Sequence, residues 1–189
     1  MTWHADVAEL LAEAGMTDSD PAFASVFASG EEAVADGHVR SAVYQRVVSV
    51  IASSGSRDRD RAVVAAILRG PDETASKGAV VALVDEIALR TTGAAEFRQW
   101  SDGLLPEIDR LRVAGFRDFI RRRVRDWLLY LSVGDGHVPT RAELAEVTEW
   151  MQRFLAERAT SPAVLAVLAG SAATRKTRNI AKHRAARHR

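Results

Sequence analysis

The chain has 189 residues, 47% of them hydrophobic and 27% charged, with 26 basic and 25 acidic residues and no cysteine. This length fits one domain of ordinary size, and the hydrophobic fraction excludes a chain that is disordered throughout. The absence of cysteine from the sequence excludes a disulfide scaffold, a thiol nucleophile, a zinc ribbon and an iron–sulfur cluster.

Apolar residues recur at helical spacing along the chain, in segments that are separated by glycines and prolines. Because proline is tolerated in the first turn of a helix, we expect all five prolines to lie at helix starts. The predicted helices cover, in chain order, residues 3–14, 21–28, 30–36, 38–54, 58–69, 73–92, 94–102, 105–113, 116–133, 140–159 and 162–186.

Two of these helices begin with a capping box, in which Ser29 precedes Glu32 and Thr140 precedes Glu143 by three residues. Two valine-rich runs have a propensity for strands, but no alternating pattern or hairpin turn accompanies them. The sequence therefore predicts an all-α fold. We expect either an irregular multi-helix bundle or a short HEAT-like stack of helical pairs, with an extended basic C-terminal helix.

We expect a helical domain over residues 1–174 and a basic helical extension over residues 175–189, because the charge changes sharply between them. The first segment holds 19 basic and 25 acidic residues, whereas the second holds seven basic residues and no acid. The helix predicted to begin at Pro162 opens with apolar turns that would be buried. Its basic end would then project about 20 Å beyond the core.

A cationic helix without acidic side chains suits a polyanion, and nucleic acid is the partner that we expect. Binding would be independent of sequence, because the extension has no aromatic residue and only one side chain suited to base readout, Asn179. The predicted contacts are Arg175, Lys176, Arg178, Lys182, Arg184, Arg187 and Arg189. Two alternatives stay open, namely a solvated tail and a tail that folds back onto acidic residues of the body.

A second basic row lies on the helix predicted over 116–133. It would form a phosphate-facing ridge made of Arg117, Arg121 and Arg125. The alternative is a solvated, ion-paired face, because Asp118, Arg122 and Asp126 alternate in sign at four-residue spacing.

Several single side chains also suggest roles. Among the four tryptophans, we expect Trp127 and Trp150 to pack in the core or between helices. Trp100 is the candidate for an exposed side chain that binds a partner. Asp85 and Glu86 lie in the middle of a largely apolar helix, and we expect them to pair with Arg90, four or five residues further on.

The string Asp-Gly-His-Val occurs twice, each time between two predicted helices. The two copies could together offer a divalent metal the side chains of Asp36, His38, Asp135 and His137. Because the string is short and glycine after a helix is common, we expect no metal and no other cofactor. The sequence contains no phosphate-binding glycine loop and no serine nucleophile elbow.

Residues 141–149 resemble the first helix of a helix-turn-helix unit, but the glycine of the turn is missing and the helix is predicted to continue to Arg158. We therefore expect a non-catalytic interaction module whose C-terminal tail contacts a polyanion and whose body binds a protein partner or a second copy. One alternative is a helical-scaffold enzyme acting on nucleic acid, with Asp85 or Asp126 as its acid. Another is a ligand-binding or dimerising regulatory domain that lacks a DNA-reading part.

The sequence also bears on cellular location. Its first residues lack the basic start and apolar core of a secretory signal. The most apolar stretch, 163–169, is shorter than the roughly 20 residues that span a bilayer. We therefore expect a soluble cytoplasmic protein with no membrane partner. Arginine outnumbers lysine by 23 to 3, a bias typical of bacterial genomes with high GC content.

Overall fold

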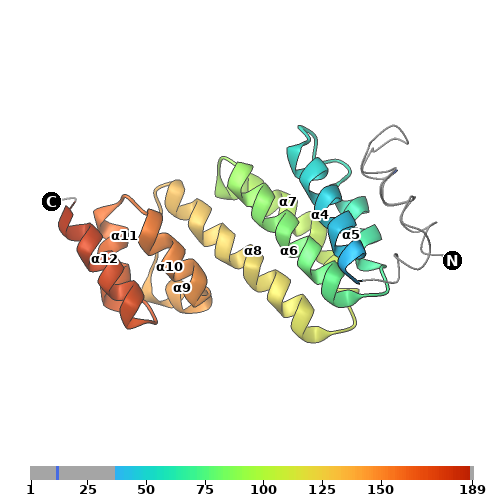
Figure 1. Cartoon of the computed structure of the whole chain (residues 1–189). Helices are drawn as coiled ribbons and strands as arrows, with labels where there is room; N and C mark the ends of the chain where they lie inside the picture. The colour runs from blue at the N-terminus through green and yellow to red at the C-terminus, as the bar shows by residue number, and fades with distance from the viewer. Residues whose placement is uncertain (1–11, 13–36, 188–189) are drawn as a thin grey trace. The chain divides into compact units, whose positions relative to one another are not determined.

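The computed structural model describes Ala12 and residues 37–187, apart from the side chains of residues 37–40. Every regular element in this part of the chain is an α-helix, which confirms the predicted all-α fold and is compatible with a multi-helix bundle (Figure 1). The helices are α4 (Gly37–Ser53), α5 (Asp60–Leu68), α6 (Glu73–Arg90), α7 (Ala94–Ile108), α8 (Ala114–Gly134), α9 (Arg141–Glu146), α10 (Glu149–Arg158), α11 (Pro162–Ser171) and α12 (Arg175–Arg187).

Four predicted helices are confirmed to within a few residues at each end. They are 38–54, 58–69, 73–92 and 116–133, which correspond to α4, α5, α6 and α8. Other predictions concern residues outside the described part, namely the helices over 3–14, 21–28 and 30–36, the capping box of Ser29 and Glu32, and the helix start at Pro21.

The two helices predicted over 94–102 and 105–113 form the single helix α7, so the predicted helix start at Pro106 is wrong. Pro106 lacks the N–H that would donate a hydrogen bond to the carbonyl oxygen of the residue four positions before it. Leu104 and Ile108, however, are 1% and 0% exposed. Burial of these side chains offsets the lost hydrogen bond and keeps the segment helical.

The helix predicted over 140–159 is wrong as one element, because α9 ends and α10 begins around Val147 and Thr148. The Thr148 hydroxyl caps α10 by accepting the N–H of Met151 at 3.2 Å. On α8, the carboxylate of Asp126 accepts the Thr148 N–H at 2.8 Å and the hydroxyl at 2.7 Å. The single helix predicted to continue through to Arg158, one of the two grounds against a helix-turn-helix unit, is therefore not present.

The helix predicted over 162–186 is also two helices, α11 and α12, joined by residues 172–174. Gln152 of α10 accepts the N–H of Ala173 through its Oε1 at 2.7 Å. Thr174 then starts α12, because its hydroxyl accepts the N–H of Thr177 at 3.1 Å. The break is thus stabilised by one side chain from another helix and by one local cap.

The described residues divide into two compact units. Unit 1 runs through Arg90 and includes Gln99–Arg121, and unit 2 comprises Thr91–Arg98 and the residues from Arg122 on. The division predicted at residue 174 does not coincide with this boundary, and whether 175–189 acts as a separate part stays a prediction.

In unit 1, α4 and α5 both pack against α6. The core consists of aliphatic side chains that are fully buried, among them Val47, Ile67 and Leu83. At Gly70 a Cβ atom would overlap the buried Tyr44 hydroxyl, so glycine is required for this close approach.

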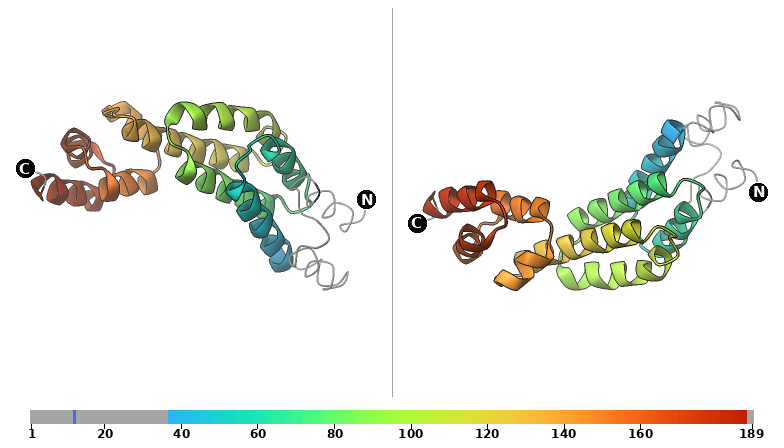
Figure 2. Two further views of the ribbon diagram at one scale, coloured as in Figure 1. Left: turned by 90° about the horizontal axis from the view of Figure 1, so that it is seen from above. Right: turned by 90° about the horizontal axis from the view of Figure 1, so that it is seen from below.

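In unit 2, α12 packs against α10 and α11, and α11 also contacts α9 (Figure 2). The predicted capping box at the start of α9 is confirmed. The Thr140 hydroxyl accepts the Glu143 N–H at 3.2 Å, and the Glu143 carboxylate accepts the Thr140 N–H at 2.7 Å. The core of the unit contains fully buried side chains from four helices, among them Leu144, Met151, Leu155, Leu165 and Ala181.

Candidate polyanion-binding site

The basic segment folds, as far as Arg187, into α12, whose 13 residues span about 20 Å. One side of α12 packs against α10 and α11, and its small side chains Thr177 and Ala181 are 2% and 0% exposed there. The expectation that this segment projects beyond the core is therefore wrong for the described residues. Arg189, the last predicted contact, lies outside them.

Two of the predicted contacts bind the protein's own backbone. Arg178 donates to the carbonyl oxygens of Ala172 and Ala173 at 2.6 and 3.0 Å, where α11 ends. Arg184 donates to the carbonyl oxygen of Ala156 at 3.2 Å, in the last turn of α10. Guanidinium groups stabilise helix C-termini because the last carbonyls lack partners and carry partial negative charge. Both arginines therefore hold α12 in place.

Four other predicted contacts share the opposite, exposed side of α12. We call this set the cationic face, and it consists of Arg175, Lys176, Lys182 and Arg187. None of the four forms an ion pair within the part of the chain that the structure describes. The alternative of a tail neutralised by the body's own carboxylates is thus not seen for these residues.

A shallow groove of about 560 Å³ runs along part of this side of the helix. It is lined by three members of the cationic face, all but Lys182, together with Asn179, Ile180, His183 and the anchoring Arg184. Asn179 and His183 are exposed, and Ile180 is half-buried. The arrangement offers several hydrogen-bond donors and positive charges, which form strong charge-assisted hydrogen bonds with phosphate or carboxylate oxygens.

The predicted ridge on α8 is engaged in internal contacts at two of its three positions. Arg117 donates to the carbonyl oxygens of Leu111 and Arg112, which follow α7. Arg121 forms an ion pair with Asp109. Arg125 is exposed and lines a second groove, of about 520 Å³, in unit 2. The ridge therefore offers an external anion fewer available cations than the cationic face does.

The expected ion-pair ladder on α8 is wrong at Asp126, which is 1% exposed and binds Thr148. Burial raises the pKa of Asp126, although the hydrogen bonds from Thr148 act in the opposite direction. On α6, the expected ion pair with Arg90 is confirmed for Glu86.

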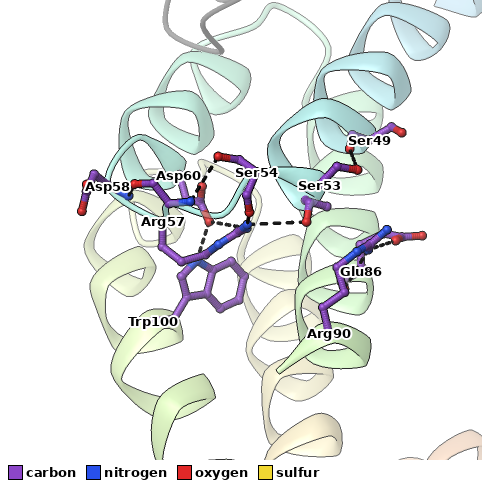
Figure 3. A network of polar contacts seen from close by, with 11 residues as sticks. Ser49, Ser53, Ser54, Arg57, Asp58, Asp60, Glu86, Arg90 and Trp100 are labelled. Atoms are coloured by element: carbon purple, nitrogen blue, oxygen red, sulfur yellow. Dashed lines mark hydrogen bonds and ion pairs between the residues drawn. The ribbon is translucent and has the colours of Figure 1, made fainter. Parts of the chain in front are cut away.

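Trp100 is half-buried, so its predicted exposure is wrong, whereas its partner-binding role stays a prediction. Its Nε1–H donates to Oδ2 of Asp60 at 2.8 Å (Figure 3). Arg57 donates to the same oxygen at 3.2 Å and also to the carbonyl oxygen of Ser54. One cluster thus joins the end of α4, the start of α5 and the middle of α7 in unit 1.

Asp60 was not predicted from the sequence as a notable side chain, although Arg57 precedes it by three residues at a helix start. Asp60 is 1% exposed, and burial raises its pKa against the hydrogen bonds of Trp100 and Arg57. It borders a serine-rich cavity of about 750 Å³. Its Oδ2 already has two donors and its Oδ1 is buried without a hydrogen-bond partner among the described residues. The carboxylate therefore has no oxygen open to a substrate.

Trp127 is 2% exposed, which confirms its predicted place in the core. Trp150 packs edge-on against Trp127 at 5.9 Å but remains 43% exposed. The guanidinium of Arg123 lies over the Trp150 ring at 4.1 Å, and Phe154 stacks at 5.2 Å with an interplanar angle of 28°. Trp150 therefore packs at the edge of the core with part of its ring exposed.

The metal hypothesis gains no support from the described residues. Asp36 and the side chain of His38 lie outside them. Asp135 accepts the first backbone N–H of α7 at 2.8 Å, and His137 forms a hydrogen bond with Glu143 at 2.9 Å. Within the described part, no three histidine or acidic side chains are grouped so that they could hold a metal ion.

Comparisons of the chain with protein-family models, with curated proteins and with solved structures found no match. Among residues 37–187, no helix combines the length and apolar character that crossing a bilayer requires. Function therefore has to be inferred from the geometry of the described residues.

Proposed function

We propose that this protein is a non-catalytic helical module that binds nucleic acid through the cationic face of α12, mainly by phosphate contacts. The observation that carries the proposal is a set of four exposed cations on one side of an ordered helix, without an ion-pair partner in the described residues. Nucleic acid presents a dense row of phosphates, and release of its condensed counterions favours binding to such a set.

The way α12 is held also supports this proposal. Thr177 and Ala181 bury one side of the helix, while Arg178 and Arg184 bind the ends of neighbouring helices. The cationic side chains are therefore carried on a backbone that does not have to become ordered on binding. Such preorganisation lowers the entropic cost of association.

The expected affinity depends strongly on salt. If all four cations neutralise phosphates, the slope of log K against log salt is about −3.6 on double-stranded DNA. A fourfold rise in salt then weakens binding by roughly a hundredfold. Sequence should matter little, because phosphate contacts fix position without reading bases.

Four simultaneous substitutions to glutamine test the proposal. The variant R175Q/K176Q/K182Q/R187Q removes the cationic face, and a matched control, R46Q/R59Q/R122Q/R141Q, removes four exposed arginines elsewhere with the same change in net charge. We expect the first variant to lose most of the salt-dependent affinity and the control to lose little. Equal loss in both variants, or no binding by the natural chain even at low salt, overturns the proposal.

Substitution is a better test than deletion. Removing residues 175–189 would also remove Thr177 and Ala181 from the core of unit 2. It would break the bonds that Arg178 and Arg184 make to α11 and α10. A deleted chain that fails to bind could therefore simply be unfolded.

The buried acids Asp60 and Asp126 do not favour the alternative of an enzyme acting on nucleic acid. Each has a raised pKa, as a general acid would, but each is 1% exposed and binds internal donors. Both act as structural links between helices. A protein partner or a second copy for the rest of the chain stays a prediction, which measurement of molecular mass in solution would test.

A further inference from the structure

We propose that α12 lies in the major groove of double-stranded DNA, so that the polyanion bound by this protein is a B-form duplex. This inference rests on the proposed function and narrows it. It follows from the order of the exposed side chains around the helix rather than from their charge alone.

The exposed cations of α12 form two rows. Residues seven apart in a helix point in nearly the same direction, because each residue turns by about 100°. Arg175 and Lys182 therefore make one row. Lys176 and Arg187, together with the exposed His183 between them, make a second row about a quarter-turn away.

A strip of small, uncharged side chains separates the two rows. It consists of Asn179 and Ala186, which are also seven residues apart and are both exposed. A helix with its side chains is about 10–12 Å wide, and the major groove of B-form DNA is about 12 Å wide. With the strip directed at the base edges, each row would face the phosphates of one strand.

The backbone anchors fix which side of α12 is presented. Arg178 and Arg184 lie on either flank of the buried Thr177 and Ala181, and they bind the ends of two different helices. The helix therefore cannot rotate about its axis without breaking these contacts. The strip and its two rows point away from α10 and α11 as a fixed surface.

Other polyanions match this surface less well. The major groove of double-stranded RNA is deep and narrow, and side chains cannot reach its bases. Single strands are usually held by stacking on aromatic rings, and the cationic face contains none. Heparin carries negative charge but has no groove, so it would contact the two rows of cations without any added affinity from the strip between them.

Binding of the full chain to four probes at one salt concentration tests the inference. The probes are a DNA duplex about two helical turns long, the RNA duplex of the same sequence, one of the DNA strands, and heparin. We expect the DNA duplex to bind at least about tenfold more tightly than the RNA duplex and the single strand.

Three variants identify the surface responsible. Asn179→Phe places a bulky group on the strip, and we expect at least about a tenfold loss for the DNA duplex with heparin binding unchanged. Asn179→Ala keeps the strip small and should bind the duplex within about threefold of the natural chain. Ala166→Phe, which adds the same ring at an exposed position of α11, is the matched control and should have no effect.

The inference is overturned if the two duplexes bind equally, or if Asn179→Phe leaves binding to the DNA duplex unchanged. In either case, binding to the nucleic-acid probes that is lost in the four-fold glutamine variant would still support the proposed function. If neither duplex nor the single strand binds even at low salt, the proposed function itself fails. Circular dichroism of each variant shows whether α12 has kept its helical structure.

Discussion

Gln152 links three helices of unit 2, and replacing it with leucine tests how the site is held. The side chain is 4% exposed. Its Nε2 donates to the carbonyl oxygen of Leu144 at 2.7 Å, where α9 ends, and its Oε1 accepts the N–H of Ala173 before α12. Leucine is similar in size but offers neither bond, so Gln152→Leu leaves two backbone groups without these partners and also removes the longer contact of Nε2 with the Val147 carbonyl oxygen at 3.4 Å.

The expected cost follows from the surroundings of these two groups. Leu144 is fully buried, so the loss at its carbonyl should lie in the upper part of the about 1–3 kcal/mol range for an unsatisfied buried group. Ala173 is exposed, and water can replace part of the bond to its N–H. We therefore expect the free energy of unfolding to fall by about 2–3 kcal/mol.

Urea unfolding followed by tryptophan fluorescence and circular dichroism measures this change, since Trp127 and Trp150 both lie in unit 2. The control is Gln45→Leu, because Gln45 is exposed on α4 and its replacement should cost less than about 0.5 kcal/mol. Equal effects of the two substitutions would refute the reasoning. We also expect Gln152→Leu to weaken nucleic-acid binding, because it loosens the turn that begins α12.

Three further substitutions test other parts of the structure. Burial raises the pKa of Asp126, so the folded state binds this proton more tightly than the unfolded state does, and the free energy of unfolding should fall as pH rises from below 3.8 through the raised pKa. Asp126→Asn should flatten this part of the pH profile, and an unchanged profile would contradict a raised pKa at Asp126. Trp100→Phe removes a hydrogen bond to the buried Asp60 and should lower the free energy of unfolding in urea by about 1–3 kcal/mol. No change in this free energy would show that the bond does not stabilise the fold. Thr140→Ala removes the cap of α9, which should cost about 1 kcal/mol and speed hydrogen exchange in its first turn, whereas an unaltered exchange rate would argue against the cap.

Local patterns predicted α4, α5, α6 and α8 because each has a long apolar stripe and clear breakers at its ends. The breaks within the segments predicted as single helices, 140–159 and 162–186, depend on residues distant in the sequence. Asp126 of α8 stabilises the break before α10, and Gln152 of α10 stabilises the break before α12. Thr148 and Thr174 were the local signals of these breaks, because threonine is a favoured N-cap residue.

The candidate site was only partly predictable for a similar reason. Counting charges was enough to single out the basic segment. It could not separate the arginines that bind backbone carbonyls, Arg178 and Arg184, from the cations that face outward. The buried side of α12 consists of Thr177 and Ala181, which are too small and too weakly apolar to stand out in a hydrophobic pattern.

Lysine reactivity offers the most direct test of where nucleic acid binds. The chain has only three lysines, of which Lys176 and Lys182 lie on the cationic face. Lys77 lies on α6 in unit 1, with its ammonium group 4.8 Å from the ring centre of Phe119. Acetylation of each lysine can be followed by mass spectrometry with and without a DNA duplex. We predict that the duplex slows acetylation of Lys176 and Lys182 and leaves Lys77 unchanged, whereas protection of Lys77 alone, or of none of the three at saturating duplex, would contradict binding through α12.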